Sequence, residues 1–479
     1  MKSDCLNRFG RLLVAWLLAG AALLEFPPAA NAELSFVFTN AAPRAMPRRA
    51  SIILIVADGL GYGDLSCYGQ TKFQTPNLDR LAAEGVRFTC YYAGDAASSP
   101  SRAALLLGKN SGHLRQRADV DVPLAPGDIT VAQCLKQSGY HTGLIGEWSF
   151  GNNATSGAPW KKGFDEFAGY FDPGDAGNWY ADYIWRYAPR SILTTNNLRE
   201  DFIGKEMLYP NMGGKKGQCI PDLYTKAALN FIQDNQPDQF NRYRPFFLLL
   251  NYRIPDGGQG QVPTDAPYSD EPWPQPEKNK AAIIERLDGY IGQLLEQLRK
   301  LNLTNDTVIF FTSDTGPETG GGVDPKFFKS AGPFRGGRGE LYEGGLRVPM
   351  IVAWPDTIPG GQVSDFPWAA WDFLPTAMSI ALTPLPGNRD GISVLPTLLG
   401  ETQTNRPGFF YWTLRERETA QAARMGDWKI VRSTPDVPWE LYNLKTDPGE
   451  TNDVAGKNPG VISQFETLLH GANLPQSAP

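Results

Sequence analysis

The chain has 479 residues, of which 42% are hydrophobic and 20% are charged, and its formal net charge is −6. This composition is typical of a globular protein with one large domain and a smaller one. The acidic balance provides no basic surface of the kind that binds nucleic acid, so we expect no nucleic-acid partner.

Residues 1–32 have the pattern of a secretory signal peptide. A basic start precedes an apolar core over residues 12–24, and the small residues Ala30-Asn31-Ala32 fit cleavage after Ala32. The apolar core is short for a membrane span, and the cleavage site disfavours an uncleaved anchor. We therefore expect a secreted or periplasmic protein with no transmembrane segment after cleavage.

The rest of the chain alternates between apolar runs and helical patterns, after an irregular segment at residues 33–50. Apolar runs typical of buried strands cover residues 51–59, 140–146, 243–252, 306–316 and 348–354. Helices are expected at residues 75–85 and 129–139, and a longer amphipathic helix has Ile284, Leu287, Ile291, Leu294, Leu295 and Leu298 on one face. Strands that alternate with helices predict an α/β fold with a large, mostly parallel sheet covered on both faces.

The pattern changes near residue 400. Short alternating segments at residues 408–416, 423–433 and 438–444 predict a small antiparallel sheet, and residues 459–471 predict a helix packed on it. The predicted organisation is therefore a signal peptide at 1–32, an irregular segment at 33–50, a large domain at 51–400 and a C-terminal α+β subdomain at 401–479. Four cysteines follow the signal peptide, and we expect at least some of them to be buried free thiols.

Two acids, Asp58 and Asp314, each follow an apolar strand. Ligand sites of open α/β sheets lie at the carboxyl ends of the strands, so these two acids are expected to meet. The stretch "SSPSR" at residues 98–102 has two interpretations. In one, Ser99 is the N-cap and Pro100 the first residue of a helix that ends at Gly108. In the other, Ser98 is a candidate nucleophile.

Nine segments resemble the sulfatase family of the arylsulfatase type, within the alkaline phosphatase superfamily. They occur in family order, and they read "ADGLGYGDLSCYG", "TPNLDRLAAEGVRFTCYYA", "SPSRAALLLG", "GYHTGLIGEW", "VIFFTSDTG", "FRGGRGELYEGGLRVPMIVAWP", "WDFLPT", "MGDWKIVR" and "WELYNLKTDPGETNDVA". The resemblance covers nearly the whole mature chain. It implies an alkaline phosphatase-like fold and an ancestry among sulfuric ester hydrolases.

The resemblance also implies roles for single residues. Ser98 falls on the residue that the family oxidises to formylglycine, and Arg102 falls on the arginine that supports the aldehyde. Asp58 and Asp314 fall on two carboxylates that bind a divalent cation, usually calcium. Thr315 falls on a third ligand of that cation, and Arg338 falls on a lysine of the site.

Several family positions are substituted in this chain, with Gly59 in place of a second acid and Thr315 in place of an asparagine. Glu147 and Ser149 replace a lysine and a histidine, and Asp256 replaces another histidine. A carboxylate about 4 Å from a sulfate repels it by roughly 4 kcal/mol at an effective dielectric near 20. We therefore expect weak or lost hydrolysis, and calcium that is weakly bound or absent.

Two alternatives remain open at this point. One is a working serine-type sulfatase, with formylglycine at Ser98, that hydrolyses the sulfate esters of a carbohydrate or an aryl compound. The other is a non-catalytic pseudoenzyme that binds a glycan or a protein. Residues 257–279, which include several prolines and Trp273, are a candidate surface for such binding, although a plain connecting loop is the simpler interpretation.

Overall fold

The computed structural model describes residues 49–116, 122–188, 202–237, 244–256, 261–405, 408–415 and 419–471. The predicted signal peptide and nearly all of the segment at 33–50 lie outside these residues. The described residues belong to one compact unit. In the described part of the chain, no helix combines the length and the apolarity that a membrane crossing requires.

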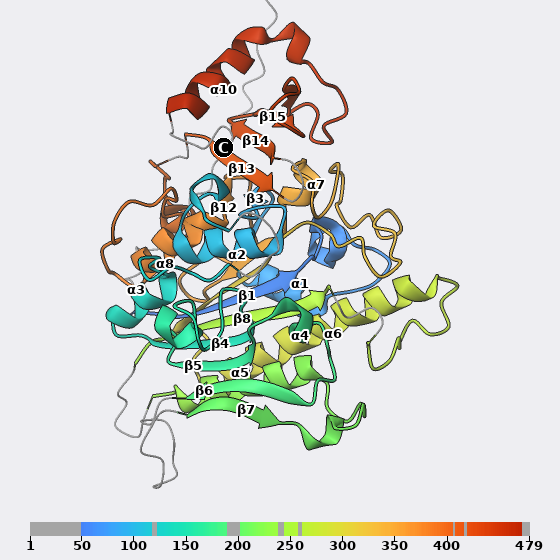
Figure 1. The fold of residues 1–479 in the computed structure, drawn as a ribbon, viewed down its shortest axis with the longest axis vertical. Coiled ribbons are helices and arrows are strands. Elements are labelled where there is room, and N and C mark those ends of the chain that lie inside the picture. Colours follow the sequence, from blue (N-terminus) through green and yellow to red (C-terminus); the bar gives the residue numbers. More distant parts are fainter. Residues whose placement is uncertain are drawn as a thin grey trace, which may run out of the picture. The chain divides into compact units, whose positions relative to one another are not determined.

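A ten-stranded sheet runs through the centre, in the order β11-β2-β10-β9-β1-β8-β4-β5-β6-β7 (Figure 1). Its strands are β1 (Ser51–Asp58), β2 (Val86–Phe88), β4 (His141–Glu147), β5 (Glu166–Tyr170), β6 (Tyr183–Ala188), β7 (Phe202–Met207), β8 (Phe246–Pro255), β9 (Thr307–Ser313), β10 (Met350–Ala353) and β11 (Gln362–Ser364). The central strands from β9 to β5 are parallel, whereas β10, β6 and β7 are antiparallel to their neighbours. This confirms the predicted large, mostly parallel sheet.

The helices cover both faces of the large sheet. They are α1 (Pro76–Ala83), α2 (Ser98–Leu107), α3 (Val131–Gln137), α4 (Pro173–Ala176), α5 (Ile220–Asp234), α6 (Gln275–Lys300), α7 (Glu343–Leu346), α8 (Phe373–Ile380), α9 (Leu395–Leu398) and α10 (Pro459–Gly471). Ile52, Leu54 and Val56 of β1 share a core with α2, α3 and α8, while Ile53 and Ile55 share another with α1, α5 and α6. Because the two cores contain different helices, the helices form two layers, one on each face of the sheet.

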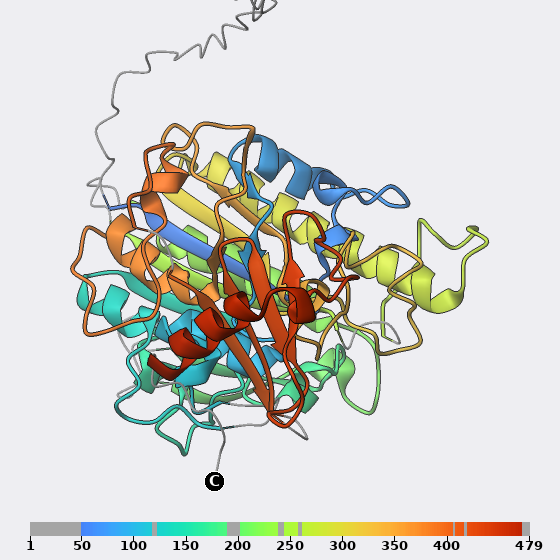
Figure 2. The same ribbon diagram turned by 90° about the horizontal axis from the view of Figure 1, so that it is seen from above.

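A second, antiparallel sheet follows near the C-terminus, as predicted. It contains β13 (Phe410–Arg415), β14 (Thr419–Met425), β15 (Trp428–Arg432) and β16 (Glu440–Asn443), and α10 crosses over it in the view of Figure 2. Phe465 of α10 joins a small core with Tyr411 and Ile430. A two-stranded pair, β3 (Tyr91–Tyr92) with β12 (Trp368–Ala369), completes the strands of the described residues.

Two further details correct or confirm the sequence analysis. The helix at "SSPSR" begins at Ser98 with Ala97 as its N-cap, so the expectation that Ser99 is the N-cap is wrong. The Ala97 carbonyl accepts from Ser101 N, which brings Ser98 into the first turn, and Pro100 takes a position whose N–H has no partner within the helix anyway. Gly108 ends the helix in the left-handed conformation, and Cys67, Cys90, Cys134 and Cys219 are free thiols.

Candidate functional site

Four neighbouring parallel strands end in acids on the same side of the sheet. The order β9-β1-β8-β4 brings together Asp314 after β9, Asp58 at the end of β1, Asp256 after β8 and Glu147 at the end of β4. Each apolar strand requires a polar residue where it leaves the core, and parallel neighbours bring these ends to one edge. The predicted meeting of Asp58 with Asp314 is therefore part of a larger acidic row.

Arg102 of α2 reaches into this row and binds three of the acids. Its Nε donates to Asp314 Oδ2 at 2.7 Å, its Nη2 donates to Asp58 Oδ2 at 2.6 Å, and its Nη1 lies 2.6 Å from Glu147 Oε1. All four side chains are at most 5% exposed. Because buried charges require partners, this guanidinium and its carboxylates depend on one another.

Ser98 lies beside the same group, at the first residue of α2. Its hydroxyl donates to Asp58 Oδ1 at 3.2 Å, and the residue is 5% exposed. The position that the resemblance assigns to the nucleophile is therefore next to the acid that the resemblance assigns to the metal. The helix interpretation of this stretch is confirmed, because Ser98 begins α2. The role of Ser98 as a nucleophile stays a prediction, and its hydroxyl faces the acidic row.

A second cluster surrounds the guanidinium of Arg338. Its Nη1 donates to Glu318 Oε2 at 2.7 Å, to Asp256 Oδ2 at 3.0 Å and to Asp58 Oδ1 at 3.1 Å. Arg253 lies close by, with Nη2 at 3.2 Å from Asp256 Oδ2 and Nη1 at 3.7 Å from Glu147 Oε2. These rim side chains are 15–20% exposed, so this cluster faces solvent more than the one around Arg102 does.

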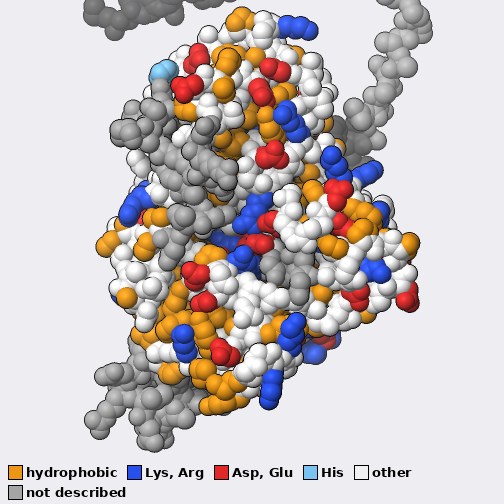
Figure 3. Space-filling view, turned by 45° about the vertical axis from the view of Figure 1, so that its right-hand side comes forward, with side chains coloured by type: hydrophobic (Ala, Val, Ile, Leu, Met, Phe, Trp, Pro, Cys, Tyr) orange, Lys and Arg blue, Asp and Glu red, His pale blue; other side chains and the backbone are white. Residues whose placement is uncertain are grey.

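The surface view agrees with a site of mixed charge. Figure 3 shows a hollow near the middle of one face, where acidic and basic side chains lie beside one another. The residues described above supply five carboxylates (Asp58, Glu147, Asp256, Asp314 and Glu318) and three guanidinium groups (Arg102, Arg253 and Arg338). A site that favours a sulfate group would instead be expected to have an excess of positive charge.

The two acids of the predicted metal pair differ in their electrostatics. Burial on its own would raise the pKa of Asp58, but Arg338, Arg102 and Arg253 hold it below its ordinary value. Burial, and then the charge of Asp58, raise the pKa of Asp314 to about 7. Burial and the charge of Asp58 also raise the pKa of Asp256. The acidic row is therefore not fully ionised near neutral pH.

The substituted positions are all in or beside the site. Gly59 has a φ of +71°, and its N–H donates to Asp314 Oδ1 at 3.2 Å. A Cβ there would lie 3.0 Å from Glu318 Cβ, so Glu318 takes the space beside it. Ser149 donates to Glu147 Oε1 at 2.5 Å, while Thr315 Oγ1 lies 3.5 Å from Asp314 Oδ1.

The residues present do not fit the calcium ion that the resemblance implies. Calcium requires six to eight oxygen ligands, but both Asp58 oxygens accept from guanidinium groups, and Asp314 accepts from Arg102 and from the Gly59 N–H. Among the described residues, no group of three or more His, Cys, Asp or Glu side chains could hold a metal ion. The two carboxylates that the resemblance assigns to the metal are instead engaged by arginines.

Sequence reasoning missed Arg253 and Glu318. Both follow the rule that located Asp58 and Asp314, because Arg253 is near the end of β8 and Glu318 follows β9 closely. The signal was therefore present, but nothing local shows that Glu318 turns back toward Arg338. That contact depends on the path of the loop between β9 and α7.

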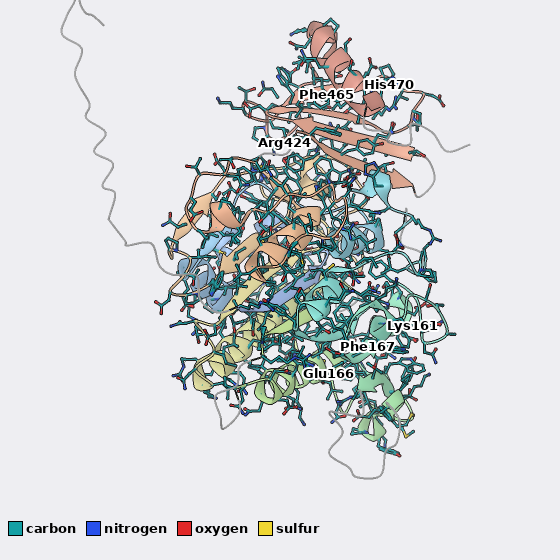
Figure 4. The ribbon with its side chains drawn as sticks, turned by 90° about the vertical axis from the view of Figure 1, so that its left-hand side faces the viewer. Lys161, Glu166, Phe167, Arg424, Phe465 and His470 are labelled. Atoms are coloured by element: carbon teal, nitrogen blue, oxygen red, sulfur yellow. The ribbon has the colours of Figure 1, made fainter. Side chains whose placement is uncertain are left out.

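The three histidines of the chain and the candidate binding residue Trp273 have partners outside this cluster. His113 Nδ1 is 2.8 Å from Asp390 Oδ2 and His141 Nε2 is 2.7 Å from Glu166 Oε1, while His470 is on α10 (Figure 4). Trp273 stacks on Tyr268 and makes edge contacts with Phe327 and Phe328. These contacts fit a packed connecting loop for residues 261–274. Residues 275–279 of the same segment instead begin α6, and residues 257–260 lie outside the described residues.

Comparisons with known proteins agree with this architecture. The sequence profile of the family described as "Sulfatase" matches residues 50–383, and the profile described as "N-sulphoglucosamine sulphohydrolase, C-terminal" matches residues 338–470. An N-acetylgalactosamine-6-sulfatase of Canis lupus familiaris is 30% identical over 84% of this chain and 76% of its own length.

For two further relatives, the match to this chain covers a larger share of the relative's own length. An N-acetylgalactosamine-6-O-sulfatase of Bacteroides thetaiotaomicron is 30% identical over 88% of this chain and 93% of its own. The solved structure of Ps i-CgsB in complex with k-i-k-neocarrahexaose is 27% identical and covers 88% of this chain and 92% of its own, with a TM-score of 0.72. The chain therefore belongs to the sulfatase family of sulfate-ester hydrolases.

Proposed function

We propose that the protein is an exported member of the sulfatase family whose hydrolysis of sulfate esters is weak or lost. The observation that carries this proposal is the ion pair between Glu147 and Arg102, with Glu147 Oε1 2.6 Å from Nη1. The resemblance expects a lysine at position 147, and that lysine would offer a positive charge to a sulfate. In this chain a carboxylate takes the same place and engages the arginine as well.

The remaining arginines support the same proposal. Arg338 is shared among three carboxylates, and Arg253 lies between Glu147 and Asp256. A sulfate that approached these groups would have to compete with the carboxylates already paired to them. At an effective dielectric near 20, each carboxylate left about 4 Å from the sulfate adds roughly 4 kcal/mol of repulsion. Hydrolysis therefore lacks the positively charged surroundings that stabilise its transition state.

The proposal extends to the cofactors of the family. We propose that calcium binds weakly or not at all, because Gly59 supplies no carboxylate and Thr315 only a hydroxyl. Calorimetric titration of the protein with calcium should then show no tight site. Binding in the nanomolar to low micromolar range, which is typical of good protein calcium sites, would contradict this.

The main test installs an aldehyde at position 98 and measures turnover of aryl sulfates and sulfated sugars. General acid–base groups contribute about 100- to 10,000-fold, and a positioned charge donor about 100- to 1,000-fold, although the two factors do not simply multiply. We expect turnover far below the common enzyme range of about 1–1,000 s⁻¹. Turnover within that range by the chain with the aldehyde but no other change would contradict the proposal.

Two variants show whether Glu147 and Ser149 cause this deficit. The double variant Glu147→Lys with Ser149→His restores the family residues and should raise turnover. The matched control, Glu147→Gln with Ser149→Ala, removes the carboxylate but supplies no donor, so its gain should be smaller. Equal turnover in the two double variants would show that the substituted donors are not the cause.

A second candidate is a working serine-type sulfatase that acts on a sulfated carbohydrate. The geometry of Ser98 favours it, because the hydroxyl lies at the start of α2 and 3.2 Å from Asp58. The name of the Bacteroides relative and the sugar bound to Ps i-CgsB both suggest the carbohydrate. The mass of the peptide that carries Ser98, from protein made in its native host, separates the candidates. An aldehyde would favour catalysis, whereas an unmodified serine would favour the degenerate site.

A further inference from the structure

We propose that Arg338 is the resident cation of this site and that its guanidinium takes the place of a metal ion between Asp58, Asp256 and Glu318. Three carboxylates approach one nitrogen atom, Nη1, at 2.7–3.1 Å. A guanidinium usually pairs with one or two carboxylates through its planar edge. Convergence of three acids on one nitrogen is instead the arrangement of oxygens around a small cation.

The identity of the acids supports this inference. Asp58 falls on a metal ligand of the family, but Asp256 and Glu318 do not, because Asp256 replaces a histidine and Glu318 comes from the loop after β9. Glu318 fills the space beside Gly59, where the family has its second acid. The chain has therefore lost one metal carboxylate and gathered two other carboxylates around an arginine.

Arg338 also differs from the other basic residues of the cluster. Arg102 is buried against Asp58, Glu147 and Asp314, and Arg253 contacts Asp256, with Nη2 at 3.2 Å from Oδ2. Only Arg338, among the site arginines described here, bridges Asp58 and Glu318. Its removal leaves Arg102 as the guanidinium that donates to Asp58 and leaves Glu318 without this partner.

Removal of Arg338 should therefore create a binding site for a divalent cation. The acid oxygens lie 2.7–3.1 Å from the nitrogen, and calcium–oxygen distances are about 2.3–2.6 Å. Shifts of a few tenths of an ångström in the side chains would bring the oxygens to a calcium ion, and Ser98 and water would supply further ligands. The loss of one positive charge among three carboxylates favours that ion strongly.

The experiment compares calcium binding by the full-length protein and its variants, using titration calorimetry and terbium luminescence. This inference rests on the proposed weak affinity of the unaltered chain. We expect Arg338→Ala to bind calcium at least about tenfold more tightly than the unaltered protein. Arg335→Ala is the matched control, because Arg335 is on the same loop but contacts Tyr442 and the Glu450 carbonyl. It should bind no better than the unaltered chain.

A further variant tests whether the new site is the one inferred. Glu318→Gln in the Arg338→Ala background should remove most of the gained affinity, because Glu318 is a ligand only if the ion replaces the guanidinium. If Arg338→Ala unfolds without calcium, recovery of its thermal transition by added calcium supports the inference, and failure to recover overturns it.

The remaining outcomes separate this inference from the proposed function. Tight calcium binding by the unaltered chain would overturn both. Weak binding by the unaltered chain together with no gain in Arg338→Ala would overturn the inference alone. A gain that persists in the variant with Glu318→Gln would place the ion elsewhere and would also overturn it.

Discussion

At the scale of single residues, Glu147 adds a negative charge to the site and contacts two of its side chains. Its carboxylate accepts from Ser149 and pairs with Arg102. Glu147 and Ser149, the positions that the resemblance assigns to a lysine and a histidine, therefore contact each other, and Glu147 contacts the arginine as well. Because these side chains contact one another, the effects of changing Glu147 and Ser149 singly are not expected to add, and a reversion should change both.

The central role of Arg102 gives a prediction about stability. Arg102→Met leaves Asp58, Glu147 and Asp314 buried without their shared partner, and removal of one member of a buried ion pair typically costs about 3–5 kcal/mol. Chemical denaturation at neutral pH should show a loss of this size. The double variant Arg102→Met with Glu147→Gln removes one of the orphaned charges and should recover part of it. A single variant within about 1 kcal/mol of the unaltered protein would contradict the prediction.

At the scale of helices and strands, the sequence predicts most of the frame of the site. The apolar runs that form β1, β4, β8, β9 and β10 are clear in the sequence, and turn residues flank them. The rule that ligand sites lie at strand ends predicted that Asp58 and Asp314 would lie close together, and both contact Arg102. The sequence could not reveal that Glu318 and Arg338 meet, because their contact depends on a long loop whose path is set by tertiary packing.

Asp372 gives a prediction at the same scale, because it ties two segments around α8 together. Its carboxylate accepts from Ala369 N and Ile392 N, both at 2.8 Å, and burial raises its pKa to about 7. The folded state therefore holds a proton that the unfolded state has already lost above its ordinary value of 3.8. As the pH rises from about 4 to about 7, this group lowers the free energy of unfolding, by about 4 kcal/mol at most.

The measurement compares the unaltered chain with Asp372→Asn from pH 5 to pH 8. The amide stays neutral, so the variant should gain stability relative to the unaltered protein as the pH rises through this range. Asp365→Asn is the control, because Asp365 is exposed and its variant should follow the unaltered chain at every pH. A constant difference between the Asp372→Asn and unaltered curves would refute the prediction.

At the scale of the whole molecule, the C-terminal sheet is part of the same compact unit as the sulfatase sheet. Trp412 Nε1 donates to Ala93 O at 3.0 Å, and Arg424 contacts Cys90 and Tyr92 between the two parts (Figure 4). The sequence predicts a change of pattern near residue 400, but local patterns carry no sign of these contacts. They join residues more than 300 positions apart in the chain.

Lys429 carries the last prediction, because it joins this sheet to α7. Its Nζ lies 3.0 Å from Glu343 Oε1 and 2.9 Å from Glu450 Oε1, and all three side chains are 0% exposed. Lys429→Met leaves two carboxylates buried without their common cation, and the expected loss is about 3–5 kcal/mol. Because the lysine belongs to β15, the damage should begin in β13–β16 and spare α6, on the large sheet.

Hydrogen exchange at the level of peptides tests this order directly. In Lys429→Met, peptides from residues 410–443 should exchange faster while those from 275–300 keep their protection. The exposed Lys445 supplies the control, since Lys445→Met removes a lysine near the same sheet without leaving a buried carboxylate unpaired. The double variant with Glu450→Gln should recover part of the loss, because it removes one of the two orphaned carboxylates. Uniform acceleration across both sheets would instead mean that the two parts unfold as one, and the proposed local joint at Lys429 would be wrong.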